Sequence, residues 1–142
     1  MRYQHNDGGR AAAGFKGTTG DCAARAVAIA AGIPYRQAYD TINAMATNER
    51  SGKRKRGVSN ARLGVFKPLM HKYLAALGFT WTPTMGIGTG CRVHMRADQL
   101  PPGRLIVSLS RHYAAVIDGV LHDNHDSSRN GTRCVYGYWR KA

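Results

Sequence analysis

Cys22, His112 and Asp123 are the residues of this chain whose types and order suit nucleophilic chemistry. A cysteine thiol becomes a nucleophile when a helix N-terminus and a neighbouring imidazole favour its thiolate form, and when a third group orients that imidazole. Cys22 follows Asp21 at the start of an alanine-rich stretch, which predicts a helix with the thiol at its N-terminus. The order of residues therefore predicts acyl transfer by a thiol, a general base and an orienting carboxylate.

The segment that carries His112 and Asp123 is predicted to be a β-hairpin. His112 opens an apolar run that turns at Asp118-Gly119, a dipeptide that favours two-residue hairpins. In such a hairpin position 123 lies opposite position 114, diagonal to His112 on the neighbouring strand. Asp123 is thus expected near the imidazole, with Asn124 and Asp126 in the following turn as equal alternatives for the orienting group.

Three helices are predicted in the first half of the chain. The first covers about residues 22–31, the second follows Pro34 with apolar residues at three- and four-residue steps, and the third has a broad apolar stripe up to Leu77. The residues that mark their ends are Asp21, Gly32, Pro34, Ser59 or Asn60, and Gly78.

The second half changes to the two-residue period of β-strands. Short alternating or apolar runs predict strands at residues 79–82, 91–95, 105–109, 113–117, 120–122 and 135–139. Residues 1–20, rich in glycine and polar groups, are expected to be an irregular lead-in. Helices followed by an antiparallel sheet of roughly five strands place residues 1–142 in the α+β class as a single domain.

The chain is strongly basic. Its 142 residues include 21 Lys and Arg but only 8 Asp and Glu, a formal net charge of +13. Such an excess attracts nucleic acids and other polyanions. The charge is densest in a glycine-flanked segment, residues 49–58, where Lys53, Arg54, Lys55 and Arg56 are candidate nucleic-acid-binding residues. A solvated loop that only adds solubility is an equally good interpretation of this segment.

The cysteines and the hydropathy pattern favour a reduced, cytoplasmic protein. The N-terminus lacks a positively charged segment leading into an apolar run, and the chain has no apolar stretch of bilayer-spanning length, so no membrane association is expected. Three cysteines leave at least one thiol free. Cys91 and Cys134 are expected to pack as ordinary apolar residues on half-buried strands.

A zinc site is the competing interpretation of the same residue types. Cys91-x-x-His94 and His122-x-x-His125 have the spacing of metal ligands, and Cys22 and Cys134 add further donors. Neither pair repeats a C-x-x-C knuckle. We therefore expect no metal and no cofactor.

The order of Cys22 at the start of the first core helix, His112 at the opening of a hairpin and Asp123 on the next strand resembles papain-like cysteine peptidases. The resemblance is to compact bacterial and phage forms, such as the domains that process double-glycine leader peptides and the cell-wall amidases. It spans residues 14–140 as an order of elements. It implies a papain-like fold and a thiol hydrolase that cleaves a peptide or isopeptide bond through an acyl-enzyme.

The resemblance also implies an oxyanion hole beside the nucleophile. Papain-like enzymes carry a Gln a few residues before the cysteine, where this chain has Phe15-Lys16-Gly17-Thr18-Thr19-Gly20, so Lys16, Thr18, Thr19 and Asp21 are the candidates for support. A small, basic chain of this kind resembles a phage protein, with a host or virion protein as substrate and the host cytoplasm or the virion as its location. The alternative is a nucleic-acid-binding protein with a vestigial Cys-His site.

Overall fold

The computed structural model describes residues 1–17, 19–49 and 58–141. The helices within these ranges are α1 (Cys22–Ala31), α2 (Tyr35–Ala46) and α3 (Lys67–Ala76). The strands are β1 (Arg2–His5), β2 (Thr80–Pro83), β3 (Val93–His94), β4 (Arg104–Leu109), β5 (His112–Ile117), β6 (Val120–Asp123), β7 (Cys134–Val135) and β8 (Gly137–Lys141). No helix of the described ranges is long and apolar enough to cross a membrane.

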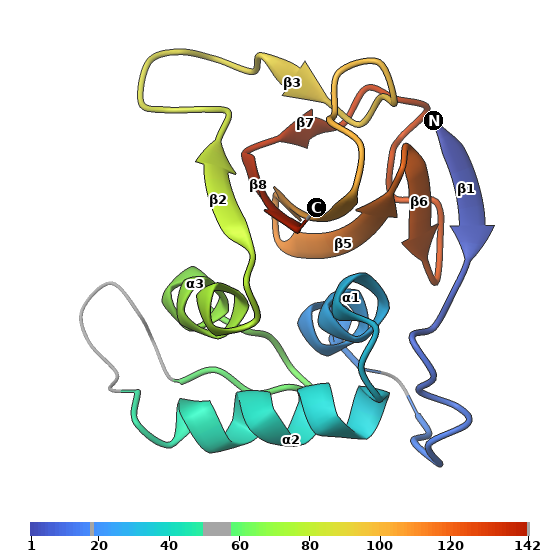
Figure 1. The fold of residues 1–142 in the computed structure, drawn as a ribbon, viewed down its shortest axis with the longest axis vertical. Helices are drawn as coiled ribbons and strands as arrows, with labels where there is room; N and C mark the ends of the chain where they lie inside the picture. The colour runs from blue at the N-terminus through green and yellow to red at the C-terminus, as the bar shows by residue number, and fades with distance from the viewer. Residues whose placement is uncertain (18, 50–57, 142) are drawn as a thin grey trace.

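The main sheet has six strands in the order β1-β6-β5-β4-β8-β2, and β3 pairs with β7 separately. All neighbours in the main sheet are antiparallel except β1 and β6, which run parallel. Helix α1 lies between α2 and the sheet, packed on β5 and β4 (Figure 1). The predicted α+β class is confirmed, with a six-stranded mixed sheet instead of roughly five antiparallel strands.

Strand β4 is central because its two faces enter two different cores. Ile106 packs with the helices, whereas Leu105 and Val107 pack in a second cluster on the far face of the sheet. Successive strand residues point to opposite faces, so a strand buried on both sides is apolar throughout. On the helical side, small side chains such as Ala23 and Ala26 fill the contact between α1 and the sheet.

The first helix and the hairpin lie where the sequence places them. The prediction of a helix over residues 22–31 is confirmed, and Gly32 ends it in the left-handed conformation with φ of 69°. Asp118 and Gly119 both have positive φ, 47° and 80°, as a two-residue turn between twisted strands requires.

Two other segments differ from the prediction. Residues 1–20 are not irregular throughout, because Arg2–His5 forms β1; all four side chains are exposed, so no apolar alternation marks the strand. The third helix begins at Lys67, next to Pro68, instead of at Ser59 or Asn60. Ser59 Oγ accepts a hydrogen bond from the Phe66 amide at 2.9 Å and thereby holds a loop in place of a helical turn.

Two strands of the second half also differ from the prediction. The strand expected over residues 135–139 is divided into β7 and β8, and the one expected over 91–95 is reduced to Val93–His94. The expectation that Cys91 and Cys134 only pack is wrong, because the two form a disulfide. Cys91 lies just before β3, which pairs with β7, and the register pairs His94 with Cys134.

The ring of Trp81 on β2 lies against Gly137 of the neighbouring strand β8. Gly137→Ala is therefore expected to lower the free energy of unfolding by about 2 kcal/mol. An added Cβ would lie 2.3 Å from Trp81 Cη2 and 3.0 Å from the Thr82 carbonyl oxygen. The Trp81 ring cannot move away freely, because it packs on Trp139 with ring centroids 4.5 Å apart. Urea unfolding measures the change.

Gly86→Ala is the matched control for this substitution, since its added Cβ would meet only Thr89 Cγ2, at an ordinary 3.7 Å. Equal unfolding midpoints for the two variants would contradict the predicted clash.

Candidate active site

Cys22 is the first residue of α1, is half-buried and is the free cysteine of the chain. Asp21 precedes it, and the Asp21 carbonyl accepts the Arg25 amide, which starts the helix. The predicted side-chain cap is wrong, because the Asp21 carboxylate makes no hydrogen bond to a first-turn amide. The backbone N–H groups at a helix N-terminus lack partners within the helix and favour a negative charge nearby. The Cys22 sulfur therefore lies where an anion is stabilised.

His112 and Asp123 are brought together by the β5–β6 hairpin. The register pairs Ala115 with His122, so position 123 falls opposite position 114, as expected from the sequence. His112 Nε2 lies 2.7 Å from Asp123 Oδ2, and the side chains are 11% and 1% exposed. A carboxylate on Nε2 fixes the ring orientation and directs the other nitrogen, Nδ1, elsewhere.

The charge state of His112 depends on both of its neighbours. Burial lowers the pKa of His112, but the hydrogen bonds to Asp123 and to Cys22, with their charges, outweigh it and raise the pKa to about 9. Cys22 thus lies close enough to influence the charge state of the imidazole, and both residues line the same cleft. At neutral pH this favours an imidazolium beside the Asp123 carboxylate.

Asp123 is held in its ionised form by several donors. Burial raises its pKa, but the hydrogen bond and charge of His112, the Ser127 hydroxyl at 2.8 Å and the charge of Arg25 lower it to about 2. The Asn124 amide also donates to Asp123 Oδ1 at 2.8 Å. Of the three carboxylate or amide groups that the sequence left open, Asp123 is the one that orients His112. Asp126 instead accepts from Ser128, and Asn124 Oδ1 lies 2.6 Å from His125 Nδ1.

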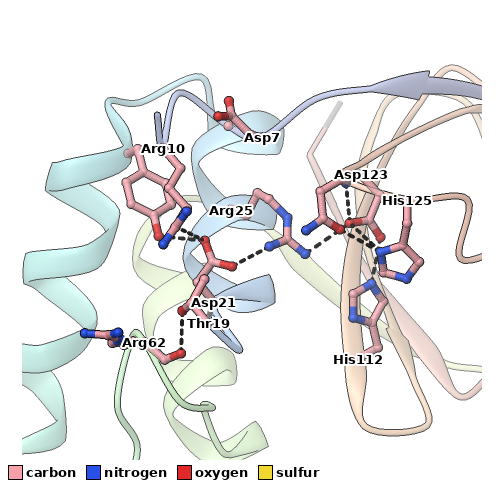
Figure 2. A network of polar contacts seen from close by, with 12 residues as sticks. Asp7, Arg10, Thr19, Asp21, Arg25, Arg62, His112, Asp123 and His125 are labelled. Carbon is pink, nitrogen blue, oxygen red and sulfur yellow. Dashed lines mark hydrogen bonds and ion pairs between the residues drawn. The ribbon is translucent and has the colours of Figure 1, made fainter. Parts of the chain in front are cut away.

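Arg25 joins helix α1, which carries Cys22, to Asp123. Its guanidinium contacts Asp21 Oδ1 through one nitrogen and Asp123 Oδ1 through the other, at 3.1 Å, with 6% of its side chain exposed. Figure 2 shows this line of contacts from Asp21 through Arg25 to Asp123 and His112. Cys22 precedes Arg25 by three residues on α1. The first turn of α1 therefore carries both the thiol and the guanidinium that contacts Asp123.

Asp21 is a buried support for this network. The Tyr35 hydroxyl donates to Asp21 Oδ2 at 2.6 Å, and Arg10 Nε lies 3.6 Å from the same oxygen. Burial and the hydrogen bond to Asp21 raise the pKa of Tyr35, so its phenol remains a donor. Asp21 therefore anchors α1 and Arg25 and cannot itself donate to an oxyanion.

Thr19 and Lys16, which were also expected to support an oxyanion, make contacts with other groups. Thr19 lines the cleft described below, but its hydroxyl donates to the Arg62 carbonyl at 2.7 Å. The Lys16 side chain is exposed, and its carbonyl accepts from Arg10. Thr18 is outside the described residues, as are Lys53, Arg54, Lys55 and Arg56 of the basic segment. The backbone amide of Cys22 is thus the donor that the helix places beside the sulfur.

A cleft of about 760 Å³ opens above Cys22 and His112. The N-terminus of α1 and the loop before α3, including Leu63 and Phe66, form part of its wall. Arg111, His125 and Tyr136 come from the sheet side. A cleft of this size matches pockets that bind small ligands, which span roughly 300–1,000 Å³.

The residues that lie close enough together to bind a metal ion differ from the two pairs that the sequence suggested for zinc. Cys91 is in a disulfide, so its thiolate is not available next to His94. Within the described residues, the group that gathers is His112, Asp123 and His125, whose ligand atoms lie within 4.8 Å of one another. His112 and Asp123 already bind each other in this group, so a metal ion would have to break that contact.

Comparison with known proteins assigns no relatives: no family model, no curated protein and no solved structure matches the chain.

Proposed function

We propose that the protein is a thiol hydrolase, a cysteine peptidase or isopeptidase of the papain-like type, with Cys22, His112 and Asp123 as its triad. The observation that carries the proposal is the position of His112, which is bound through Nε2 to a buried carboxylate at 2.7 Å and lines the same cleft as Cys22. A free cysteine kept only for packing would need neither an imidazole nor a helix N-terminus.

The proposed reaction begins with attack by the Cys22 thiolate on a substrate carbonyl carbon. A carbon–sulfur bond forms, and the carbonyl oxygen takes up the negative charge, which the Cys22 amide and the α1 N-terminus stabilise. His112 then donates its proton to the leaving amine nitrogen as the carbon–nitrogen bond breaks. Water, deprotonated by His112, hydrolyses the thioester and regenerates the thiol.

Asp123 has a positioning role in this scheme. It holds the ring of His112 through Nε2 and stabilises the imidazolium, without taking its proton. The low pKa of Asp123, about 2, is consistent with a carboxylate that stays ionised throughout.

The ion pair can be tested without knowing the substrate, through iodoacetamide alkylation of Cys22. Under non-reducing conditions Cys22 is the free thiol, since Cys91 and Cys134 are bonded. At about pH 6 an ordinary thiol, with a pKa of about 8.5, is almost wholly protonated. We expect the native protein to react at least about tenfold faster at that pH than His112→Ala, which lacks the imidazolium. Mass spectrometry of the alkylated peptide gives the rates.

His5→Ala is the matched control for this experiment, because His5 is exposed and lies on the edge strand β1. It should react like the native protein. Equal rates for native protein and His112→Ala would refute the ion pair and, with it, the hydrolase.

We propose that the substrate is a protein or peptide and that the protein has a phage-related role. The Cys91–Cys134 disulfide favours an oxidising environment over the reduced cytoplasm expected from the sequence, since such bonds are rare in the cytoplasm. The alternative function, nucleic-acid binding through Lys53–Arg56, has the net charge of +13 in its favour.

A further inference from the structure

The charges that line the cleft are unequal. Of its described lining residues, only Asp21 is acidic, and that carboxylate is fully buried and paired with Arg25. Lys67 and Arg111 are exposed cations of the same lining, and no carboxylate contacts either of them in the described ranges. The open face of the cleft is therefore positive.

Two helices reinforce that charge. The lining includes the first residue of α1, Cys22, and the first residue of α3, Lys67. Each helix has ten residues, so both N-termini contribute the partial positive charge of a helix dipole. Anionic groups are favoured where such ends meet cationic side chains.

Arg111 is held in a conformation that disfavours it. Its φ is 56°, in the left-handed region that Gly and Asn adopt far more readily than a long side chain. It forms the turn between β4 and β5, next to His112. The turn thus places an arginine side chain beside His112 in the lining of the cleft.

The cleft also has an apolar wall. Leu63 is 77% exposed and Val58 is 48% exposed, and both belong to the lining. Exposed aliphatic side chains beside a pocket favour an apolar group on its ligand.

We infer that the substrate is an acidic peptide, which places an Asp or Glu side chain or a terminal carboxylate at Arg111 and Lys67 and an apolar side chain against Leu63. This inference rests on the proposed hydrolase and names its substrate class. The guanidinium of Arg111 can bind a carboxylate through two hydrogen bonds, and Lys67 supplies a second positive charge.

The first test compares an anionic and a neutral reagent at the same thiol. Iodoacetate and iodoacetamide both alkylate the Cys22 sulfur: a carbon–sulfur bond forms as the carbon–iodine bond breaks and iodide leaves. Only iodoacetate carries a carboxylate. Arg111→Asn removes the charge and suits the left-handed backbone. At low salt, it should lower the ratio of the iodoacetate rate to the iodoacetamide rate by about fivefold, through the loss of electrostatic attraction. Arg111→Lys should retain most of the native ratio, and high salt should reduce the native ratio.

Arg129→Asn is the matched control, because Arg129 is also an exposed arginine with positive φ, 51°, but does not line the cleft. Its rate ratio should equal that of the native protein. If Arg111→Asn and Arg129→Asn give the same ratio, the inference fails while the ion pair of Cys22 and His112, measured with iodoacetamide alone, can still stand.

The second test uses a mixture of peptides from a digested proteome, incubated with the native protein or with Cys22→Ala. Mass spectrometry should find cleavage that depends on Cys22, with Asp or Glu enriched near the new termini and the enrichment reduced in Arg111→Asn. Cleavage without acidic enrichment would overturn the substrate class alone, and no Cys22-dependent cleavage would count against the hydrolase. Protection of Cys22 from iodoacetamide by a DNA oligonucleotide but not by an acidic peptide would assign the cleft to nucleic acid and overturn the inference.

Discussion

Arg25→Met should lower the free energy of unfolding by about 3–5 kcal/mol, because it removes the cation between two buried carboxylates. Asp21 and Asp123 are 0% and 1% exposed, and Arg25 contacts both. Methionine fills a similar volume, so the loss would come from the uncompensated charge instead of from a cavity. Urea unfolding of the native protein and the variant measures the difference.

Two further variants separate charge from packing. Arg96→Met removes an exposed cation that pairs with Asp98 at 2.9 Å, and should leave the unfolding midpoint nearly unchanged, because solvent screens this pair. Asp21→Asn combined with Arg25→Met neutralises one of the two carboxylates that lose Arg25 and should recover part of the loss. If the double variant is no more stable than Arg25→Met, the charge argument is wrong.

The stability that the His112–Asp123 pair contributes should fall both at alkaline pH, where His112 loses its proton, and at acidic pH, where Asp123 gains one. The pKa of His112 is raised from 6.5 to about 9, so its contribution is complete below about pH 6.5 and is lost as the pH rises through about 9. The pKa of Asp123 is lowered from 3.8 to about 2, so its contribution is present above pH 3.8 and is lost as the pH falls through about 2. The stability from this pair is thus greatest between about pH 4 and 6.5.

The alkaline side of this profile is the sharper measurement. Between about pH 6.5 and 9 the native protein should lose on the order of 3 kcal/mol of unfolding free energy, since each pKa unit corresponds to about 1.4 kcal/mol. His112→Ala should remove this slope. Cys22→Ser should reduce it, because the hydrogen bond and charge of Cys22 help to raise the pKa of His112. Parallel pH profiles for the native protein and His112→Ala would contradict the pair.

The features that local sequence signals fix were predictable. Gly32, followed by Pro34, marks the end of α1, and Asp118-Gly119 fixes the turn of the hairpin. Since the hairpin sets its own register, the proximity of His112 and Asp123 followed from counting residues. What these signals share is that each operates over only a few residues.

The features that depend on distant parts of the chain were not predictable in this way. Arg25 stands in an alanine-rich helix, and a charge among buried positions was its only signal; its partner Asp123 is 98 residues away. Strand β1 has no buried side chains, so nothing in its pattern marks it. The Cys91–Cys134 bond depends on how β3 and β7 pair. A short strand pair of this kind carries too few residues for a periodic pattern.

The pairing of β1 with β6 has a consequence for the order of events during synthesis. The Tyr3 hydroxyl and the Asn6 amide both donate to the Asp123 carbonyl oxygen, the former across a separation of 120 residues. Contacts this distant in sequence close late in folding. The proposed nucleophile, Cys22, is synthesised before its proposed base and acid, His112 and Asp123. On that proposal, a nascent chain carries an ordinary thiol, and the reactive site arises only when β1 has paired with β6.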